Sequence, residues 1–393
     1  MGLQITPVAG PRDVRAFVDL PFRLHAGTPW IPPLKLERYA YLNKHLGIFY
    51  KGGEAQLFLA RRDGRVVGRV SAQISHTFNE AQDNRWGLFG FVEFEDDQEV
   101  VDGLLAAAES WLRARGRDRM VGPADFVFND EIGLLIEGYE REPMIRHPWH
   151  PPYYRDRIEQ AGLAKAMDMF HWHLEISDRQ ERMMPILPEL ARACEEKHGI
   201  TIRRMTRRTL KRDLAEAVRI YNTAWARNWG FIPYTPEEMT DLWVDYQLIF
   251  DEDWFMIAEN PDGESVAMAI TIPDINQIYK RMGGTLLPGG WLDYLRRGRI
   301  IDRVRIGWLG VLPEYQHTGV AAALYMEHYA TAARTRISHG EAGWILESNR
   351  SMNRGLEAMG GHISKVARVY ERTFEPDAVP AAPPASVRRY VRK

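Results

Sequence analysis

The fold is decided by the stretch Ile306-Gly307-Trp308-Leu309-Gly310-Val311-Leu312-Pro313-Glu314-Tyr315-Gln316-His317-Thr318-Gly319-Val320-Ala321. Its apolar first half is typical of a strand, a proline marks a turn, and a glycine with small residues opens a long helix. The first N–H groups of a helix lack intrahelical partners and carry partial positive charge. Small residues at Gly319 and Ala321 let an anion approach them closely. The segment therefore predicts a pyrophosphate-binding loop that needs no cationic side chain.

The residues on both sides of this stretch predict a strand-rich domain. Upstream, Pro261-Asp262-Gly263 separates two apolar runs and predicts a hairpin turn. Downstream, an apolar run precedes a short helix and a last strand. The expected elements are strand Ile200–Met205, helix Leu210–Trp225, hairpin strands Trp254–Glu259 and Glu264–Ile272, strand Arg305–Leu312, helix Gly319–Arg334, and strands Ala342–Glu347 and Ser364–Arg372.

The first half of the chain repeats this order of elements. Its strand–helix junction at Phe94 lies 218 residues before the junction at Leu312. Self-similarity at half the chain length indicates an internal duplication. The matching elements are strand Leu3–Val8, hairpin strands Ala55–Arg61 and Val66–Ser75, strand Leu88–Phe94 and helix Glu99–Arg115. The fold class is therefore α+β (α/β mixed), with two tandem domains, each a mixed and mostly antiparallel sheet flanked by helices.

The pattern Val311-x-Pro313-x-x-Gln316-x-x-Gly319-x-Ala321 resembles the acetyl-CoA signature of the GNAT (Gcn5-related N-acetyltransferase) superfamily. The resemblance implies acyl transfer from acetyl-CoA or a longer acyl-CoA, used as co-substrate, to an amine. In that family the strand backbone pairs with the pantetheine arm and the loop amides hold the pyrophosphate. Carried over by position, the cofactor-binding residues are Leu309, Val311, Gln316, His317, Thr318, Gly319, Val320 and Ala321.

A second family element follows after the strand Ala342–Glu347. The segment from Ser348 to Gly361 resembles the family's Asn-x-x-Ala, helix and Gly ending, which adds Asn349 and Asn353 to the cofactor-binding residues. Two residues depart from the pattern. Met352 replaces the usual alanine, and Leu356 stands where many members carry a tyrosine that protonates the departing thiolate. Tyr370, Tyr325 or solvent could serve as the acid instead.

Acyl transfer to an amine also needs a stabilised oxyanion and a neutral nucleophile. The backbone N–H of Val311, beside the thioester, is the candidate oxyanion donor. Glu347 ends the strand next to the CoA strand and is the candidate base, because partial desolvation raises the pKa of a carboxylate. A competing interpretation is that Glu347 caps the following helix together with Ser348 or Asn349.

The domain boundaries follow from these patterns. Residues 200–375 form the CoA-binding domain, residues 177–199 a linker with a helix, and residues 376–393 a mobile tail. Residues 1–176 form a GNAT-like domain in which Phe94–Glu99 replaces the phosphate loop. Its carboxylates would repel a pyrophosphate. We expect this domain to have lost CoA binding and to form one wall of the acceptor cleft.

The acceptor site is predicted from aromatic residues in glycine-rich segments. Trp229 and Phe231 follow the first helix of the second half, and Trp291 lies in the insertion Pro273–Arg303. The insertion is interpreted either as a flexible lid over a long acyl chain or lipid acceptor, or as a packed helix that closes the domain interface. His171 and His173 share one strand face without a third ligand nearby in sequence, and no metal is expected.

Composition narrows the function classes further. A net charge of −2 argues against nucleic-acid binding, and one cysteine, Cys194, argues against a disulfide or a cysteine zinc cluster. No run approaches the roughly 18 apolar residues of a membrane span. We expect a cytoplasmic protein with a small-molecule or lipid amine acceptor and at most peripheral membrane contact. Two alternatives remain: aminoacyl or peptidyl transfer of the tandem-GNAT peptidoglycan type, and a non-catalytic CoA-binding protein.

Overall fold

The computed structural model describes residues 2–175, 183–235, 238, 249–287, 289–375 and 380–381. The chain divides into two compact units. Unit 1 comprises Met1–Met169, Ile278–Tyr294 and Lys365–Ser386, and unit 2 comprises Phe170–Gln277, Leu295–Ser364 and Val387–Lys393. Most of the tail and the first residues of the predicted linker, 177–182, lie outside the described residues.

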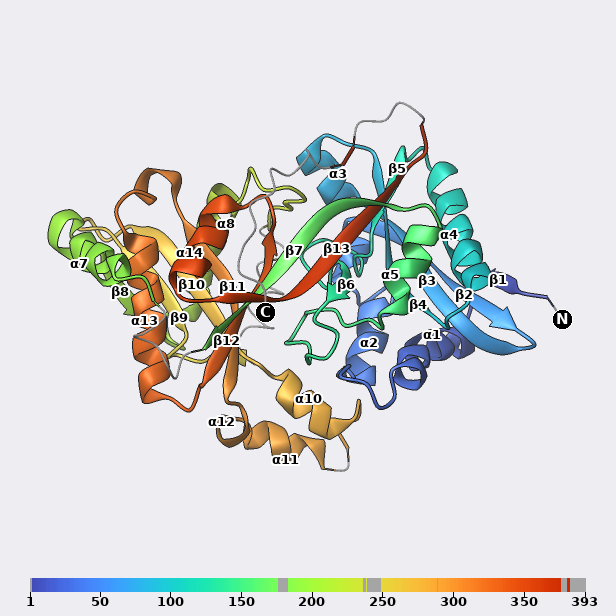
Figure 1. The fold of residues 1–393 in the computed structure, drawn as a ribbon, viewed down its shortest axis with the longest axis horizontal. Helices are drawn as coiled ribbons and strands as arrows, with labels where there is room; N and C mark the ends of the chain where they lie inside the picture. Colours follow the sequence, from blue (N-terminus) through green and yellow to red (C-terminus); the bar gives the residue numbers. More distant parts are fainter. Residues whose placement is uncertain are drawn as a thin grey trace. The chain divides into compact units, whose positions relative to one another are not determined.

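Unit 1 is a sheet in the order β1-β2-β3-β4-β5-β13, with β6 also paired to β13 (Figure 1). Its pairs are antiparallel except for the parallel pair β4–β5. The strands are β1 Gln4–Pro7, β2 Gly53–Arg62, β3 Arg65–Ser75, β4 Trp86–Phe94, β5 Arg119–Gly122, β6 Leu134–Glu137 and parts of β7 Ala164–Glu175 and β13 His362–Thr373. The helices are α1 Pro11–Leu24, α2 Lys35–Leu42, η1 Ile48–Lys51, α3 His76–Gln82, α4 Gln98–Arg113, α5 Tyr153–Gln160 and most of α10 Asn276–Met282 and α11 Gly290–Leu295.

Unit 2 carries the order β8-β9-β10-β11-β12, antiparallel except for the parallel pair β11–β12. Its strands are β8 Thr201–Arg204, β9 Phe255–Glu259, β10 Ser265–Pro273, β11 Arg303–Val311 and β12 His339–Leu346. Its helices are α7 Ile186–His198, α8 Leu210–Ala224, α12 Arg297–Ile300, η2 Pro313–Tyr315, α13 Val320–Arg334 and α14 Arg350–Ala358. The two units thus repeat a hairpin, a strand, a helix and a parallel strand, which confirms the predicted tandem fold.

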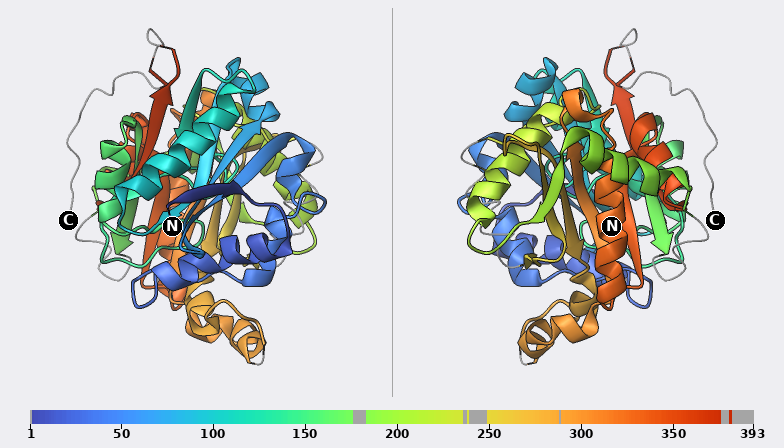
Figure 2. Two further views of the ribbon diagram at one scale, coloured as in Figure 1. Left: turned by 90° about the vertical axis from the view of Figure 1, so that its right-hand side faces the viewer. Right: turned by 90° about the vertical axis from the view of Figure 1, so that its left-hand side faces the viewer.

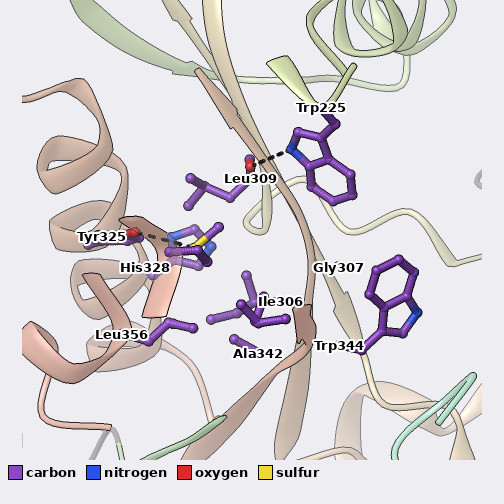
Figure 3. A pocket seen from close by; sticks show the side chains of 11 residues that line it. Trp225, Ile306, Gly307, Leu309, Tyr325, His328, Ala342, Trp344 and Leu356 are labelled. Carbon is purple, nitrogen blue, oxygen red and sulfur yellow. Dashed lines mark hydrogen bonds between the residues drawn. The ribbon is translucent and has the colours of Figure 1, made fainter. Parts of the chain in front are cut away.

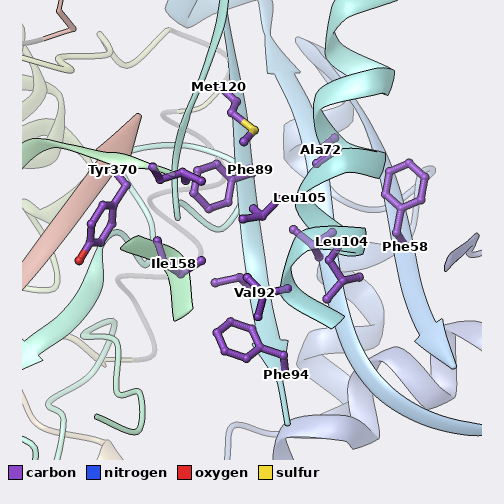
Figure 4. Packing of buried hydrophobic residues seen from close by; sticks show 14 of the residues in the cluster. Phe58, Ala72, Phe89, Val92, Phe94, Leu104, Leu105, Met120, Ile158 and Tyr370 are labelled. Carbon is purple, nitrogen blue, oxygen red and sulfur yellow. The ribbon is translucent and has the colours of Figure 1, made fainter. Parts of the chain in front are cut away.

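The core of unit 1 shows why the apolar spacing predicts α4. Val101, Leu104 and Leu105 recur at helical intervals and are buried against the sheet, together with Phe89 and Phe94 (Figure 4). Figure 2 shows this helix crossing the strands of the same unit. The side chain of Asp97 accepts a hydrogen bond from the N–H of Glu99 and so caps the helix start. Burial of one helix face and a satisfied first turn together stabilise the element.

The compact units and the predicted domain boundaries differ at β13 and in the insertion. Residues Lys365–Ser386 belong to unit 1, where Tyr370 pairs with Gly122 of β5 and joins the apolar core. Residues 278–294 of the insertion also belong to unit 1. Alternating apolar residues identify a strand but not the sheet that receives it. No helix among the described residues is long and apolar enough to span a membrane.

Candidate functional site

The parallel strands β11 and β12 of unit 2 separate after a short paired stretch. Their register runs from Arg303 opposite His339 to Ile306 opposite Ala342, although β11 continues to Val311 and β12 to Leu346. The separation of β11 from β12 follows from the pairing on the other edge of β11, where it contacts β10. Ile270 of β10 pairs with Trp308 and Thr271 pairs with Ile306, which leaves Gly307 as an extra residue. A bulge of this kind bends its strand and ends regular pairing.

The bend leaves backbone groups of β11 facing the space between the strands. The N–H of Leu312 donates to the carbonyl of Val266 in β10 at 3.0 Å. Backbone groups alternate between the two edges of a strand. The backbone N–H and C=O groups of Leu309 and Val311 therefore point away from β10. The expected pairing of this strand with a pantetheine arm requires this orientation. The indole Nε1 of Trp225 donates to the Leu309 carbonyl at 3.3 Å, so this edge already receives a hydrogen bond.

A pocket lies where the two strands separate (Figure 3). It encloses about 420 Å³ of empty space, including its open mouth. The pocket is mostly apolar, and its walls come from both strands, from α13 and α14, and from the residue that ends α8. The lining residues are Trp225, Ile306, Gly307, Leu309, Tyr325, His328, Ala342, Trp344, Ile345, Met352 and Leu356.

Tyr325 supplies a protonated hydroxyl in this lining. Its Oη donates to the Sδ of Met352 at 3.6 Å, and a Cβ added to Gly355 would lie 2.5 Å from the same Oη. Burial raises the pKa of Tyr325 to about 12. The hydroxyl of α13 therefore reaches α14 beside Leu356, the position at which the family pattern has its tyrosine.

His328 is the second polar group of the lining, and it is held as a neutral imidazole. Its Nδ1–H donates to the carbonyl of Leu324 at 2.7 Å, and its Nε2 accepts from the Thr271 hydroxyl at 2.8 Å. Burial lowers the pKa of His328 to about 4. Because both ring nitrogens are used, this residue ties α13 to β10.

The start of α13 retains the features of an anion site. Gly319 is its N-cap, with φ 84°, and no side chain caps the helix. The first-turn N–H groups therefore have no intrahelical partner. Gln316 and His317 are exposed, whereas Val320 and Thr318 are buried, and the Thr318 hydroxyl donates to the Tyr315 carbonyl at 2.7 Å. A Cβ on Gly319 would lie 2.5 Å from the carbonyl oxygen of Leu190 in α7.

The two asparagines assigned to cofactor binding serve the helix that contains them. Asn349 is the N-cap of α14 and accepts from the N–H of Met352 at 3.1 Å. Asn353 is fully buried. Its Nδ2 donates to the carbonyls of Leu346 and Asn349, and its Oδ1 accepts from the indole of Trp172 at 2.8 Å. Asn353 offers no exposed atom to a cofactor in this structure.

The candidate acid and base lie outside the pocket lining. Tyr370 is 1% exposed in the core of unit 1, where its hydroxyl donates to Glu159 at 3.0 Å. Glu347 directly follows the last residue of β12 and is half-buried. The alternative role considered for Glu347 was to cap the following helix, and the side chain that makes this cap hydrogen bond is Asn349.

The predicted acceptor residues occupy different surroundings. The ring of Phe231 packs on Tyr221, which in turn stacks on Trp308 of β11 at 5.2 Å between ring centroids. Trp229 is half-buried in the same loop, and Trp291 is 45% exposed on α11 of unit 1. Trp225 and His328, which line the pocket, were not among the predicted site residues. The glycine within β11 signalled the bulge, because glycine inside a strand often marks one.

In unit 1 the corresponding strand β4 keeps hydrogen-bonding to the chain that follows β5. Strands β4 and β5 pair from Trp86 to Leu88, and β4 then reaches Phe91, whose φ is positive. The N–H of Phe91 donates to the carboxylate of Asp125 at 2.8 Å. The next residue, Phe126, is fully buried and stacks on Phe49 at 4.5 Å. The N–H of Ala124 also donates to the Phe89 carbonyl at 2.8 Å, so the chain after β5 stays hydrogen-bonded to β4 beyond Leu88, whereas β12 separates from β11.

The start of α4 is also closed to a phosphate. Asp97 caps it, and the carboxylates of the preceding loop bind arginines of unit 1. Arg62 pairs with Asp97 at 2.8 Å, and Arg157 pairs with Asp96 at 2.7 Å. An incoming anion would have to displace these internal partners.

Comparison with known proteins finds two similar sequences. No family model matches the chain. It is 34% identical over 383 residues to the bacterial ceramide synthase of Caulobacter vibrioides, covering 95% of this chain and 98% of that protein. It is 33% identical over 370 residues to Protein YghO of Escherichia coli, covering 92% and 93%.

Two solved structures share the fold. A tandem GNAT protein from the clavulanic acid biosynthesis pathway has a TM-score of 0.54 at 12% identity, covering 96% of this chain and all of that one. A GCN5-related N-acetyltransferase from Sphaerobacter thermophilus has a TM-score of 0.55 at 14% identity, covering 97% and 98%. These likenesses establish the tandem GNAT architecture over nearly the whole length.

Proposed function

The chain belongs to the acyltransferase family of the bacterial ceramide synthase, built on the tandem GNAT fold, and we propose that it transfers an acyl group from acyl-CoA to the amine of a lipid. The product would be an N-acylated amino lipid. The relative's name motivates the acceptor class: ceramide is a long-chain amino alcohol acylated on its nitrogen. The amine of a sphingoid base is therefore the proposed acceptor.

The observation that carries the proposal is the apolar pocket between β11 and β12. The open backbone edge of β11 leads from Val311 to Leu309, and Leu309 lines the pocket. A pantetheine arm along that edge would place its thioester at the pocket and its pyrophosphate at the start of α13. Leu356 and Met352 make the wall apolar, so the pocket suits a hydrocarbon chain. Each buried CH₂ contributes about 0.8 kcal/mol.

Acyl-CoA supplies the activated carbonyl, and backbone donors of this chain would stabilise the charge that develops on its oxygen. Leu309 is a better candidate donor than Val311, because Leu309 lines the pocket and Val311 does not. Its N–H points to the same open edge. The Trp225 indole donates to the Leu309 carbonyl, which lies on the same edge in the next peptide unit.

Tyr325 is the proposed acid for the departing thiolate. It lines the pocket, its raised pKa keeps the hydroxyl protonated at neutral pH, and its only recorded partner among the described residues is a thioether, a weak acceptor. Tyr370, by contrast, does not line the pocket. Glu347 remains the candidate base that removes a proton from the acceptor amine. The variant Glu347→Gln tests this role.

The test is a transfer assay with the purified full chain. Acetyl-, octanoyl- and palmitoyl-CoA are each offered with a sphingoid base and with a small polar amine such as glucosamine, and the N-acyl products are quantified by mass spectrometry. We expect the fastest turnover with a long-chain acyl-CoA and the sphingoid base. CoA binding without turnover of any amine would contradict catalysis, and fastest turnover of acetyl-CoA with glucosamine would contradict the lipid acceptor.

A matched pair of variants locates the acyl chain. Met352→Phe fills the pocket and should lower turnover of palmitoyl-CoA by about tenfold or more relative to acetyl-CoA, since several CH₂ groups lose their burial. Met326→Phe is the control: Met326 is also partly buried, on α13, but does not line the pocket. Equal chain-length preference in both variants would place the acyl chain elsewhere.

A further inference from the structure

Arg305 of β11 donates two hydrogen bonds to β12 at the point where the two strands of unit 2 separate. Its guanidinium Nε and Nη2 donate to the carbonyl oxygen of Gly343 at 3.2 Å and 3.1 Å. The strand ladder ends one residue earlier, with Ile306 opposite Ala342. Gly343 is therefore the first residue of β12 beyond the paired stretch, and its carbonyl accepts from a side chain of β11.

The neighbouring strands hold Arg305 in regular β-structure. It pairs with Ile272 of β10 on one side and with Glu341 of β12 on the other. The bulge at Gly307 comes only two residues later. A guanidinium is a planar fork whose donors keep a fixed spacing, so two bonds to one oxygen restrict where the Gly343 carbonyl can lie. Arg305 is thus fixed at its base and binds β12 through its tip.

The Gly343 carbonyl needs a donor because this residue is buried. A buried carbonyl that loses its hydrogen bond destabilises the fold. Without the guanidinium, the N–H groups on the open edge of β11 would be the alternative donors across the same gap. Trp344, which follows Gly343, lines the pocket (Figure 3). A movement of this carbonyl toward β11 would therefore move a wall of the pocket and cover the open edge.

We propose that Arg305 is a positioning residue that holds β12 away from β11 and so keeps the open edge of β11 accessible to acyl-CoA. The guanidinium takes the place of a strand partner for Gly343, which leaves the N–H of Leu309 available to the thioester oxygen. Arg305 does not line the pocket, so it acts through β12 and not on the substrate. The role of the open edge in binding acyl-CoA rests on the proposed function, whereas the separation of the strands can be measured without ligand.

Hydrogen exchange of the ligand-free full chain at constant pH tests the strand separation. Arg305→Met keeps the apolar stem of the side chain and removes the fork. We expect the amides of residues 307–312 to exchange about tenfold more slowly in this variant than in the wild type, because β12 then pairs with them. Arg305→Lys keeps the charge without the fork and should change the exchange in the same direction.

Arg336→Met is the matched control. Arg336 is an exposed arginine of the same unit, and its Nη1 donates to the backbone carbonyl of Arg299 at 2.5 Å, outside the pocket lining. This variant also loses a bond from an arginine to a backbone carbonyl, but the carbonyl does not face the gap between β11 and β12. Its amides at residues 307–312 should exchange as in the wild type. Melting temperatures close to that of the wild type establish that the variants fold.

Titration calorimetry with acetyl-CoA tests the consequence for binding. The affinity should fall about tenfold or more in Arg305→Met and stay at the wild-type value in Arg336→Met. Guanidinium chloride at about 50 mM should restore much of the affinity of Arg305→Met, because the free ion presents the same fork to the Gly343 carbonyl. A general loss of stability would not respond in this way.

Unchanged exchange at residues 307–312 in folded Arg305→Met and Arg305→Lys variants would overturn the role of Arg305, whatever the result with acetyl-CoA. Wild-type affinity for acetyl-CoA in Arg305→Met would overturn it too. A wild type that binds no acetyl-CoA would contradict the proposed function alone, and the exchange measurement would still decide whether Arg305 holds the strands apart.

Discussion

Tyr325 is the proposed acid in a site where Leu356 stands at the family's tyrosine position. The family's tyrosine position holds an apolar residue here, while a hydroxyl from α13 reaches the same pocket. Tyr325→Phe should lower kcat about 10²-fold or more and leave acyl-CoA affinity nearly unchanged, because the hydroxyl acts on the leaving group. Stopped-flow release of free CoA under saturating substrate measures this.

Tyr329 provides the matched control for that substitution. It lies one turn further along α13, and its hydroxyl donates to the Met359 carbonyl at 2.5 Å, outside the pocket. Tyr329→Phe removes a structural hydrogen bond and should retain turnover. If both variants kept the wild-type kcat, the thiolate would leave without this acid.

The predicted loop residues and the predicted reacting groups rest on different kinds of sequence signal. Gln316, Gly319 and Ala321 follow from one motif in which residue size and backbone geometry decide the chemistry. The role of Asn353 depends on three partners far apart in the chain, which no local pattern reveals. Tyr370 fits the polarity of a strand, but the pairing of β13 with β5 carries it into the core of unit 1.

At the scale of elements, His328 couples the stability of the α13–β10 packing to pH. Its pKa is about 4 in the fold, below the ordinary value near 6.5. The unfolded chain therefore binds a proton between these values while the folded chain does not. This contribution is fully present above pH 6.5 and is lost as the pH falls to about 4, by about 3 kcal/mol.

Chemical denaturation from pH 8 to pH 4 measures the effect. His328→Gln should show a flatter decline of unfolding free energy between pH 6.5 and 4 than the wild type. His317→Gln replaces an exposed histidine of the same unit and should keep the wild-type slope. Identical slopes in all three proteins would mean that His328 is not buried in its neutral form.

The strand order and the strand separation differ in how far sequence predicts them. Apolar alternation and the Pro-Asp-Gly turn identify the hairpin β9–β10, which the structure confirms. The separation of β11 from β12 requires the register on both edges of β11, and only Gly307 hints at it. The insertion offered two interpretations because its apolar residues could be either buried or exposed. In the structure Ile278 and Met282 are buried, whereas the leucines of the insertion are exposed.

At the scale of the whole molecule, the two GNAT-like units differ at the equivalent strand pair: β11 and β12 separate, whereas β4 stays hydrogen-bonded to the chain after β5. In unit 2 the bulge at Gly307 and the uncapped start of α13 are the features at which we propose pantetheine and pyrophosphate bind. In unit 1 Asp125 takes the strand N–H, and Asp97 takes the helix start. The order of elements was predictable for both halves, whereas the hydrogen bond from the Phe91 N–H to Asp125 was not.

Titration calorimetry with acetyl-CoA tests the central claim most directly, with a glutamate placed at Ala321. A glutamate in the first turn of α13 favours the helix dipole, so Ala321→Glu should fold while repelling the pyrophosphate. Gly319 is unsuitable because its positive φ and the nearby Leu190 carbonyl would confound folding with binding. The account predicts one acetyl-CoA per chain for the wild type and for Ala330→Glu, an exposed charge-matched control on α13, and none for Ala321→Glu. Two sites per chain, no site, or unchanged affinity in a folded Ala321→Glu variant would contradict it.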